Sequence, residues 1–142
     1  DLSWLRANTS MNLVLKGIVT AEDARLCRKA GVDGVIVSNH GGRQEGNGRG
    51  TMDVLPEVAD VLSGKMPVLM DGGIRRGADV FKALAAGADA VCVGRPYLFG
   101  LAAGGQDGVE LSLNILQTEF ERTQIYAGVP ESQGISVESI WR

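Results

Sequence analysis

The residues of this sequence best suited to chemistry lie in one short stretch, Ser38 to Gln44, which reads Ser-Asn-His-Gly-Gly-Arg-Gln. His40 is the only histidine among 142 residues, and Arg43 follows it three positions later. Imidazole exchanges protons near neutral pH, and a guanidinium binds a carboxylate through two parallel hydrogen bonds. A lone histidine is more often structural, but the pair favours a general base beside an anchor for a carboxylate substrate.

Two later glycine-rich turns also carry arginines. Asp71-Gly-Gly-Ile-Arg-Arg-Gly77 follows one apolar run, and Gly94-Arg-Pro96 follows the next. Glycines let backbone N–H groups approach an anion, a helix start adds a favourable dipole, and arginine adds charge-assisted hydrogen bonds. Either turn alone is commonly a solvated loop, but two in adjacent units favour a phosphate site. Lys16 also ends an apolar run, and it either extends into solvent or stabilises negative charge on a cofactor or substrate.

Four apolar runs precede these polar residues, and helix-like segments alternate with them. The predicted strands are 12–16, 34–38, 67–71 and 90–94, and the predicted helices are 20–31, 53–64, 78–86 and 108–126. Thr20 is a suitable N-cap for the first of these helices, and Gly31 a suitable end. Continuously apolar strands that alternate with helices predict a parallel sheet covered by helices.

The polar residues directly after each strand indicate which kind of parallel sheet this is. In a (β/α)₈ barrel the catalytic residues follow the strands, and phosphate sites favour the loops after the last two strands. A complete barrel needs about 250 residues and eight strands. The sequence therefore predicts one domain, residues 1–142, that forms the C-terminal half of a TIM (β/α)₈ barrel, strands 5–8 with their helices. A small open doubly wound sheet is the alternative.

The composition narrows the classes of partner. The net charge of −3 indicates neither a nucleic-acid nor an anionic-membrane partner. Cys27 and Cys92, with no CxxC pair, favour reduced buried thiols over a disulfide framework or a metal site. No apolar run has the length of a membrane span, and no secretory signal is present, so we expect a cytoplasmic protein.

Five motifs occur in order along nearly the whole chain: Leu15-Lys-Gly17 with Thr20-Ala-Glu-Asp-Ala24, Ser38–Gln44, Asp71–Gly77, Asp79-Val-Phe-Lys-Ala-Leu84 and Gly94-Arg-Pro96. Together they resemble the C-terminal half of the FMN-dependent α-hydroxy acid oxidases and dehydrogenases. That family includes glycolate oxidase, lactate oxidase and monooxygenase, and mandelate dehydrogenase. Other phosphate-binding barrels, the type 2 isopentenyl diphosphate isomerases and the IMP dehydrogenases, share the glycine-arginine turns but are disfavoured by Ser-Asn-His-Gly-Gly-Arg.

The resemblance implies FMN-dependent oxidation of an L-2-hydroxy acid to the 2-oxo acid. His40 would contact the substrate and act as the base while electrons pass to the flavin, and which substrate proton it takes stays open. Arg43 would bind the substrate carboxylate. The resemblance assigns FMN to residues from all four strand ends: Lys16 near flavin N1 and O2, Ser38 at the isoalloxazine, Asp71 at the ribityl hydroxyls, and Gly72, Gly73, Ile74, Arg75, Gly94 and Arg95 around the phosphate.

Two departures from the family pattern matter. Glu45–Gly50 replaces the usual short Leu-Asp continuation, which leaves the choice among hydroxy acids such as lactate, glycolate and mandelate open. The first four strands are absent from this chain, and in the family they supply flavin contacts, a substrate-binding tyrosine and an aspartate that orients the histidine. The resemblance therefore implies the N-terminal half of the barrel as a partner, either a separate chain or a missing segment, and a homo-oligomer, by resemblance a tetramer.

Two alternatives stay open at this point. The half-barrel could be a non-catalytic module that binds phosphate or flavin. Membrane association also stays open, because some relatives carry a membrane segment in the connection that precedes this region.

Overall fold

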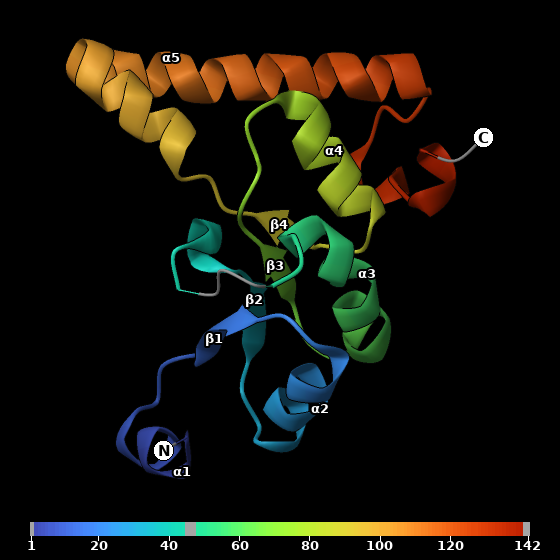
Figure 1. Ribbon diagram of the computed structural model, residues 1–142. Helices are drawn as coiled ribbons and strands as arrows, with labels where there is room; N and C mark the ends of the chain where they lie inside the picture. The colour runs from blue at the N-terminus through green and yellow to red at the C-terminus, as the bar shows by residue number, and fades with distance from the viewer. Residues whose placement is uncertain (1, 45–47, 141–142) are drawn as a thin grey trace.

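A computed structural model describes residues 2–44 and 48–140 of the chain (Figure 1). The first three residues of the loop 45–50, whose sequence differs from the family pattern, lie outside the described residues. Four parallel strands form one sheet in the order β1-β2-β3-β4. The strands are β1 (Val14–Ile18), β2 (Gly34–Val37), β3 (Val68–Met70) and β4 (Ala90–Val91). The predicted parallel sheet is confirmed. Because the spatial order follows the chain order, the sheet has the topology of a barrel and lacks the switch point of a doubly wound sheet.

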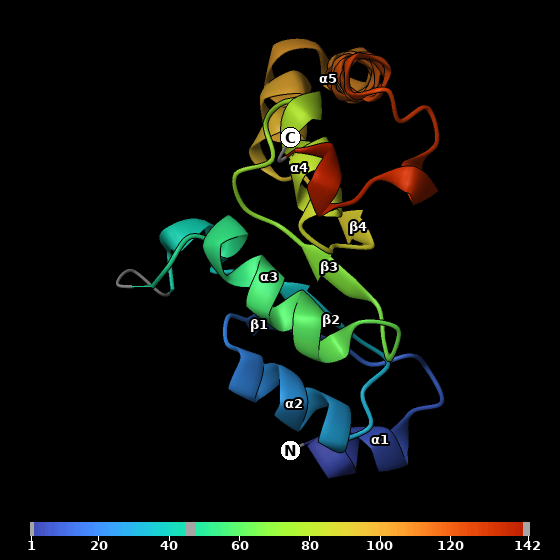
Figure 2. The same cartoon turned by 90° about the vertical axis from the view of Figure 1, so that its right-hand side faces the viewer.

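The helices lie mainly on one face of this sheet. They are α1 (Leu2–Asn8), α2 (Ala21–Lys29), α3 (Thr51–Leu62), α4 (Gly77–Ala85) and α5 (Arg95–Ala127). Three 3₁₀ turns are η1 (His40–Gly42), η2 (Ser132–Gly134) and η3 (Val137–Ser139). In Figures 1 and 2, α2, α3 and α4 cover the same side of the strands. Within the described residues, no helix combines the length and the apolar character needed to cross a membrane.

The hydrophobic core lies between the sheet and these helices. Its fully buried members include Val35 and Val37 of β2 and Leu55 and Leu62 of α3. The opposite face is partly bare, since Val14 of β1 is 46% exposed although it lies in a largely apolar strand. β1 and β4 each pair on one side only among the described strands. A sheet with one uncovered apolar face and two free edges is an incomplete barrel.

Strand β1 extends two residues beyond its predicted end at Lys16. The extension depends on Gly17, whose φ of +99° lies in the left-handed region that glycine adopts without strain. The pairing with β2 shifts its register between Lys16 and Ile18, which is a β-bulge. The last predicted strand, 90–94, is shorter than expected, since β4 ends at Val91.

Helix α5 is the main difference between the predicted and the observed elements. It begins directly after Gly94, thirteen residues before the predicted start, and is interrupted at Gly104 and Gly105, where the two segments meet at an angle (Figure 1). A Cβ on Gly100 would lie 2.3 Å from the carbonyl oxygen of Gly108. Glycine disfavours a helix by intrinsic propensity, but in α5 the glycines allow two helix segments to cross with their backbones in contact.

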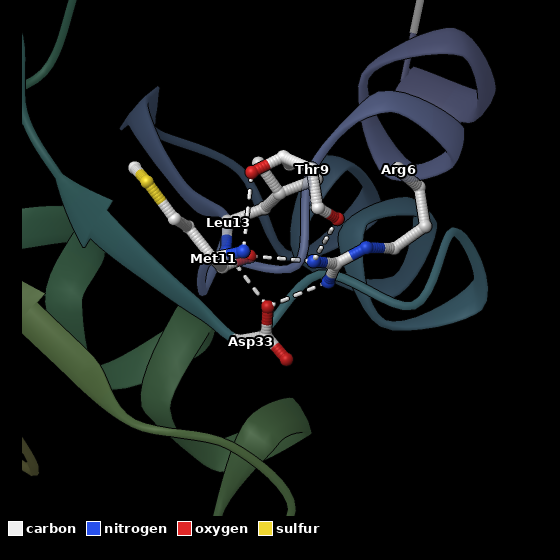
Figure 3. Close-up of polar contacts among 5 residues, drawn as sticks. All are labelled: Arg6, Thr9, Met11, Leu13 and Asp33. Atoms are coloured by element: carbon white, nitrogen blue, oxygen red, sulfur yellow. Dashed lines mark hydrogen bonds and ion pairs between the residues drawn. The ribbon is translucent and has the colours of Figure 1, made fainter.

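Two aspartates close the N-terminal ends of the strand pairs in the same way. Asp33, just before β2, accepts from Arg6 Nη1 at 2.8 Å and from the N–H of Leu13 at 2.7 Å (Figure 3). The N–H of Asp33 donates to the carbonyl of Leu13 at 2.8 Å. Asp89, just before β4, accepts from the N–H of Val68 at 2.8 Å and donates its own N–H to the carbonyl of Val68. Each aspartate therefore ties its strand to the one beside it, and Arg6 adds α1 to the first pair.

Candidate active site

A pocket of about 480 Å³ opens at the C-terminal ends of the four strands. Its lining includes all the predicted catalytic, substrate-binding and cofactor-binding residues except Ser38. They are Lys16, His40, Arg43, Asp71, Gly72, Gly73, Ile74, Arg75, Gly94 and Arg95. A larger hollow, of about 1000 Å³, lies between α3 and α4 and contains none of these residues. The smaller pocket is therefore the candidate site, because it holds the groups that can do chemistry.

A network of Lys16, Ser38 and Asp71 forms the floor of the pocket. Lys16 Nζ forms an ion pair with Asp71 Oδ2 and donates to Ser38 Oγ at 3.0 Å. Ser38, only 1% exposed, also accepts from the N–H of His40 at 3.1 Å. Among the described residues, the second carboxylate oxygen, Asp71 Oδ1, is buried without a hydrogen-bond donor. An unpaired buried acceptor is costly, so this oxygen indicates a donor that a ligand supplies.

His40 is held in an uncommon backbone conformation at the start of η1. Its φ of +55° places a non-glycine residue in the left-handed region, which is concentrated at functional sites. The side chain of Asn39 supports the turn by accepting from the N–H of Gly42 at 3.2 Å. A Cβ on Gly17 would lie 3.4 Å from His40 Cε1, so the imidazole packs beside the bulge of β1. Within the described part of the chain, no group hydrogen-bonds to the ring, which leaves both nitrogens available.

Arg43 follows η1 directly and lines the same pocket as His40. Its side chain is exposed, and no carboxylate in residues 2–44 and 48–140 pairs with it. The turn therefore presents a guanidinium three residues from an imidazole, and neither group is paired within the described residues. The structure thus places both residues in one pocket, and their roles as base and carboxylate anchor stay a prediction.

The N–H groups at the start of α4 already have acceptors within the chain. Asp79 Oδ2 accepts from the backbone N–H of Arg75 at 3.0 Å and of Arg76 at 2.9 Å. Glu119 Oε2 accepts from the N–H of Gly77 at 2.9 Å. The favourable helix start that the sequence suggested for α4 is thus used internally, and an anion in the pocket needs other donors.

Those donors are available at the start of α5 and on two arginines. Gly94 provides no side-chain cap to α5, and Pro96 has no N–H, so the donors that this helix start offers to an anion are the N–H groups of Arg95 and Tyr97. The guanidinium groups of Arg75 and Arg95 have no partner among the described residues and line the pocket. Gly73 has a φ of +78°, and a Cβ placed on it would have no neighbour within 4 Å, so its backbone is accessible. These groups together form a candidate anion site.

Ile74 differs from the other predicted site residues. Its side chain is 4% exposed and belongs to the hydrophobic core, so only its backbone can approach a ligand. Cys92, which the sequence indicated as a buried structural thiol, is half-buried and lines the pocket. Met70 pairs with Val91, so Cys92 lies level with Asp71 in the register of β3 and β4. The alternation of side chains along a strand could therefore have predicted from the sequence that Cys92 lines the pocket. Cys27 is buried as expected, and burial raises the pKa of its thiol.

The fold and this pocket define a class of protein: one half of a (β/α)₈ barrel with a pocket at the carboxyl ends of its strands. The chain belongs to the FMN-dependent dehydrogenase family, whose profile matches residues 1–142. The resemblance found in the motifs and the half-barrel fold are both confirmed.

Named relatives show how much of a whole protein this chain represents. It is 53% identical over 136 residues to the peroxisomal (S)-2-hydroxyacid oxidase GLO3 of Arabidopsis thaliana, with 96% of this chain and 38% of the relative covered. Identity to the glycolate oxidase of Spinacia oleracea is 48% over 136 residues, with 96% of this chain and 37% of the relative covered. A solved structure of a mandelate oxidase mutant with a monooxide FMN adduct matches with a TM-score of 0.91 and 46% identity, covering 94% of this chain and 43% of the other. The chain thus spans about two fifths of the length of these relatives.

Proposed function

We propose that this chain is the C-terminal half of the catalytic barrel of an enzyme that uses FMN to oxidise an L-2-hydroxy acid to the 2-oxo acid. The observation that carries the proposal is the convergence of His40, Arg43, Lys16 and an anion site in one pocket, from four strand ends that are distant in the sequence. Relatives named as 2-hydroxyacid oxidase, glycolate oxidase and mandelate oxidase support the same reaction class.

The residues of the pocket fit FMN. The buried unpaired oxygen of Asp71 suits a ribityl hydroxyl, which can donate the missing hydrogen bond. Arg75, Arg95 and the uncapped start of α5 suit the phosphate. By resemblance, Lys16 would hold the flavin near N1 and O2, and Ser38, which accepts from Lys16 Nζ, would contact the isoalloxazine. When bound, FMN supplies the two-electron acceptor that no side chain of this chain can provide.

His40 and Arg43 would act on the substrate. The guanidinium fork of Arg43, which no carboxylate pairs with in residues 2–44 and 48–140, can hold the substrate carboxylate in a bidentate pair. His40 would take the substrate proton, because no described residue pairs with its ring nitrogens and its position is fixed by the turn after β2. The positive charge of Lys16 would stabilise negative charge on the reduced cofactor.

The other half of the barrel would complete this site. The exposed inner face around Val14 and the free edges of β1 and β4 provide the surface that such a partner would cover. The partner would be either a missing segment of the same polypeptide or a separate chain. By resemblance, the complete barrels would assemble as a homo-oligomer.

Native mass spectrometry of the purified protein tests the proposal. The expected result is one FMN for each complete barrel, formed by this chain with the other half. Anaerobic addition of lactate, glycolate or mandelate should then bleach the flavin absorbance. A flavin-free homodimer of this chain would support a non-catalytic half-barrel instead, and a flavin that none of the three acids bleaches would contradict the proposed reaction.

A further inference from the structure

We propose that Glu119 of α5 is a positioning residue for the cofactor phosphate. It holds Arg76 and the start of α4 in place, so that of the two adjacent arginines only Arg75 faces the phosphate. This inference rests on the proposed function, because it requires that the pocket bind FMN.

The carboxylate of Glu119 contacts the phosphate turn at three points. Its Oε2 accepts from the N–H of Gly77 at 2.9 Å and from Nε of Arg76 at 3.0 Å. Its Oε1 lies 2.7 Å from Nη2 of Arg76. The pair is therefore a two-pronged guanidinium–carboxylate contact with a helix N–H added, between residues 43 positions apart in the sequence.

Close packing of α4 against α5 fixes the position of this carboxylate. A Cβ on Gly77 would lie 2.0 Å from the backbone nitrogen of Phe120 and 2.4 Å from the carbonyl carbon of Glu119. The start of α4 thus lies directly on the backbone of α5. The N–H of Gly77, followed by Arg76, holds the pKa of Glu119 below its usual value, so the residue is a carboxylate at neutral pH.

The two neighbouring arginines have different surroundings. Arg75 lines the pocket and has no partner within the described residues, whereas Arg76 does not line the pocket and is paired with Glu119. The backbone N–H groups of both donate to Asp79, so the turn cannot exchange one arginine for the other without losing these bonds. Glu119 therefore sets which cation is left for the phosphate.

The charge of Glu119 allows a clear test, because two explanations predict opposite changes in the affinity for FMN when that charge is removed. If Glu119 were only a nearby negative charge, its removal would release Arg76 and strengthen the binding of a phosphate dianion. If Glu119 positions the turn, its removal weakens FMN binding although the net charge becomes more favourable. Riboflavin, which lacks the phosphate, separates an effect on the phosphate site from a general loss of structure.

The experiment measures the dissociation constants of FMN and riboflavin for the complete protein after removal of its flavin, by quenching of flavin fluorescence. For Glu119→Gln we expect the Kd of FMN to rise about tenfold, as for the loss of a charge-assisted hydrogen bond, and the Kd of riboflavin to stay unchanged. Glu121→Gln is the matched control, since Glu121 lies on the same helix, is exposed and contacts Gln117. It should change neither constant.

Arg76→Gln provides a second variant that leaves the contact between Glu119 and Gly77 in place. It should also weaken FMN binding, and the double variant should bind FMN no more weakly than the worse single variant, because both remove the same contact. The inference is overturned if Glu119→Gln binds FMN as tightly as the wild type or more tightly, or if it loses FMN and riboflavin in parallel. Failure of the proposed function gives a different result: the wild type shows no preference for FMN over riboflavin, and Arg75→Gln changes nothing.

Discussion

For the substitution Gly77→Ala, helix propensity and tertiary packing predict opposite changes in the free energy of unfolding. Gly77 is the first residue of α4, and its φ does not require glycine. By intrinsic helix propensity, alanine would stabilise the helix by up to about 1 kcal/mol. In the structure, however, the added Cβ would lie 2.0 Å from the nitrogen of Phe120 and 2.5 Å from Cβ of Glu119.

The size of the effect follows from what the methyl group meets. Overpacking of this kind costs about 1–3 kcal/mol, and values at the upper end apply where the neighbours are backbone atoms that cannot change rotamer. After subtraction of the helix-propensity gain, we expect the free energy of unfolding to fall by about 2 kcal/mol. The loss of close contact between α4 and α5 should also weaken the contact of Glu119 with Gly77.

The assay is urea unfolding of the flavin-free complete protein, followed by circular dichroism. Gly34→Ala is the matched control, because Gly34 lies in β2 without a positive φ and its added Cβ would lie 3.4 Å or more from its neighbours, which is ordinary van der Waals contact. An unfolding midpoint for Gly77→Ala equal to or above that of the wild type would refute the reasoning from packing.

Two further predictions concern Asp33, which joins the N-terminal ends of β1 and β2, and Arg43, the proposed anchor of the substrate carboxylate. The hydrogen bond from the N–H of Leu13, and secondly the contact with Arg6, hold the pKa of Asp33 below its usual value of about 3.9. The stabilisation from this carboxylate is therefore present at neutral pH and is lost as the pH falls through the lowered pKa. Asp33→Asn should therefore lower the thermal midpoint at neutral pH, and the difference from the wild type should shrink on acidification to about pH 2; a difference that does not depend on pH would contradict this account. Arg43→Lys should raise KM and lower kcat in steady-state oxidation of a hydroxy acid, since an ammonium cannot form the bidentate pair; unchanged kinetics would exclude the carboxylate role.

Much of the fold is encoded locally and was predictable. Each strand begins in a short apolar run, and a glycine or a polar residue follows each run. The apolar pattern and these following residues therefore suffice to locate the strands, although not the last residue of β1 or β4. Thr20 caps α2 by accepting from the N–H of Asp23 at 3.0 Å, as its position before an acidic first turn indicated. The residues after each strand were therefore expected at one end of the sheet, and they line one pocket.

The errors share one physical cause, contacts between residues distant in the sequence. The start of α5 was missed because Gly100, Gly104, Gly105 and Gly108 disfavour a helix by propensity, while the crossing of the two segments requires small residues. Packing of the turn on the sheet also decides that the side chain of Ile74 lies in the core, whereas a backbone contact of Ile74 with the cofactor stays a prediction.

The sequence by itself determined the half-barrel and the pocket's inventory of groups, because strand and helix periods and the residues that follow them are local properties. Only the tertiary structure decided which groups are already paired. The sequence does not distinguish the adjacent Arg75 and Arg76. In the structure Glu119, 43 residues beyond Arg76, pairs with Arg76, and Arg75 has no partner among the described residues. The pairing of Lys16 with one oxygen of Asp71, and the burial of the other without a donor, likewise follow from strands brought together by packing.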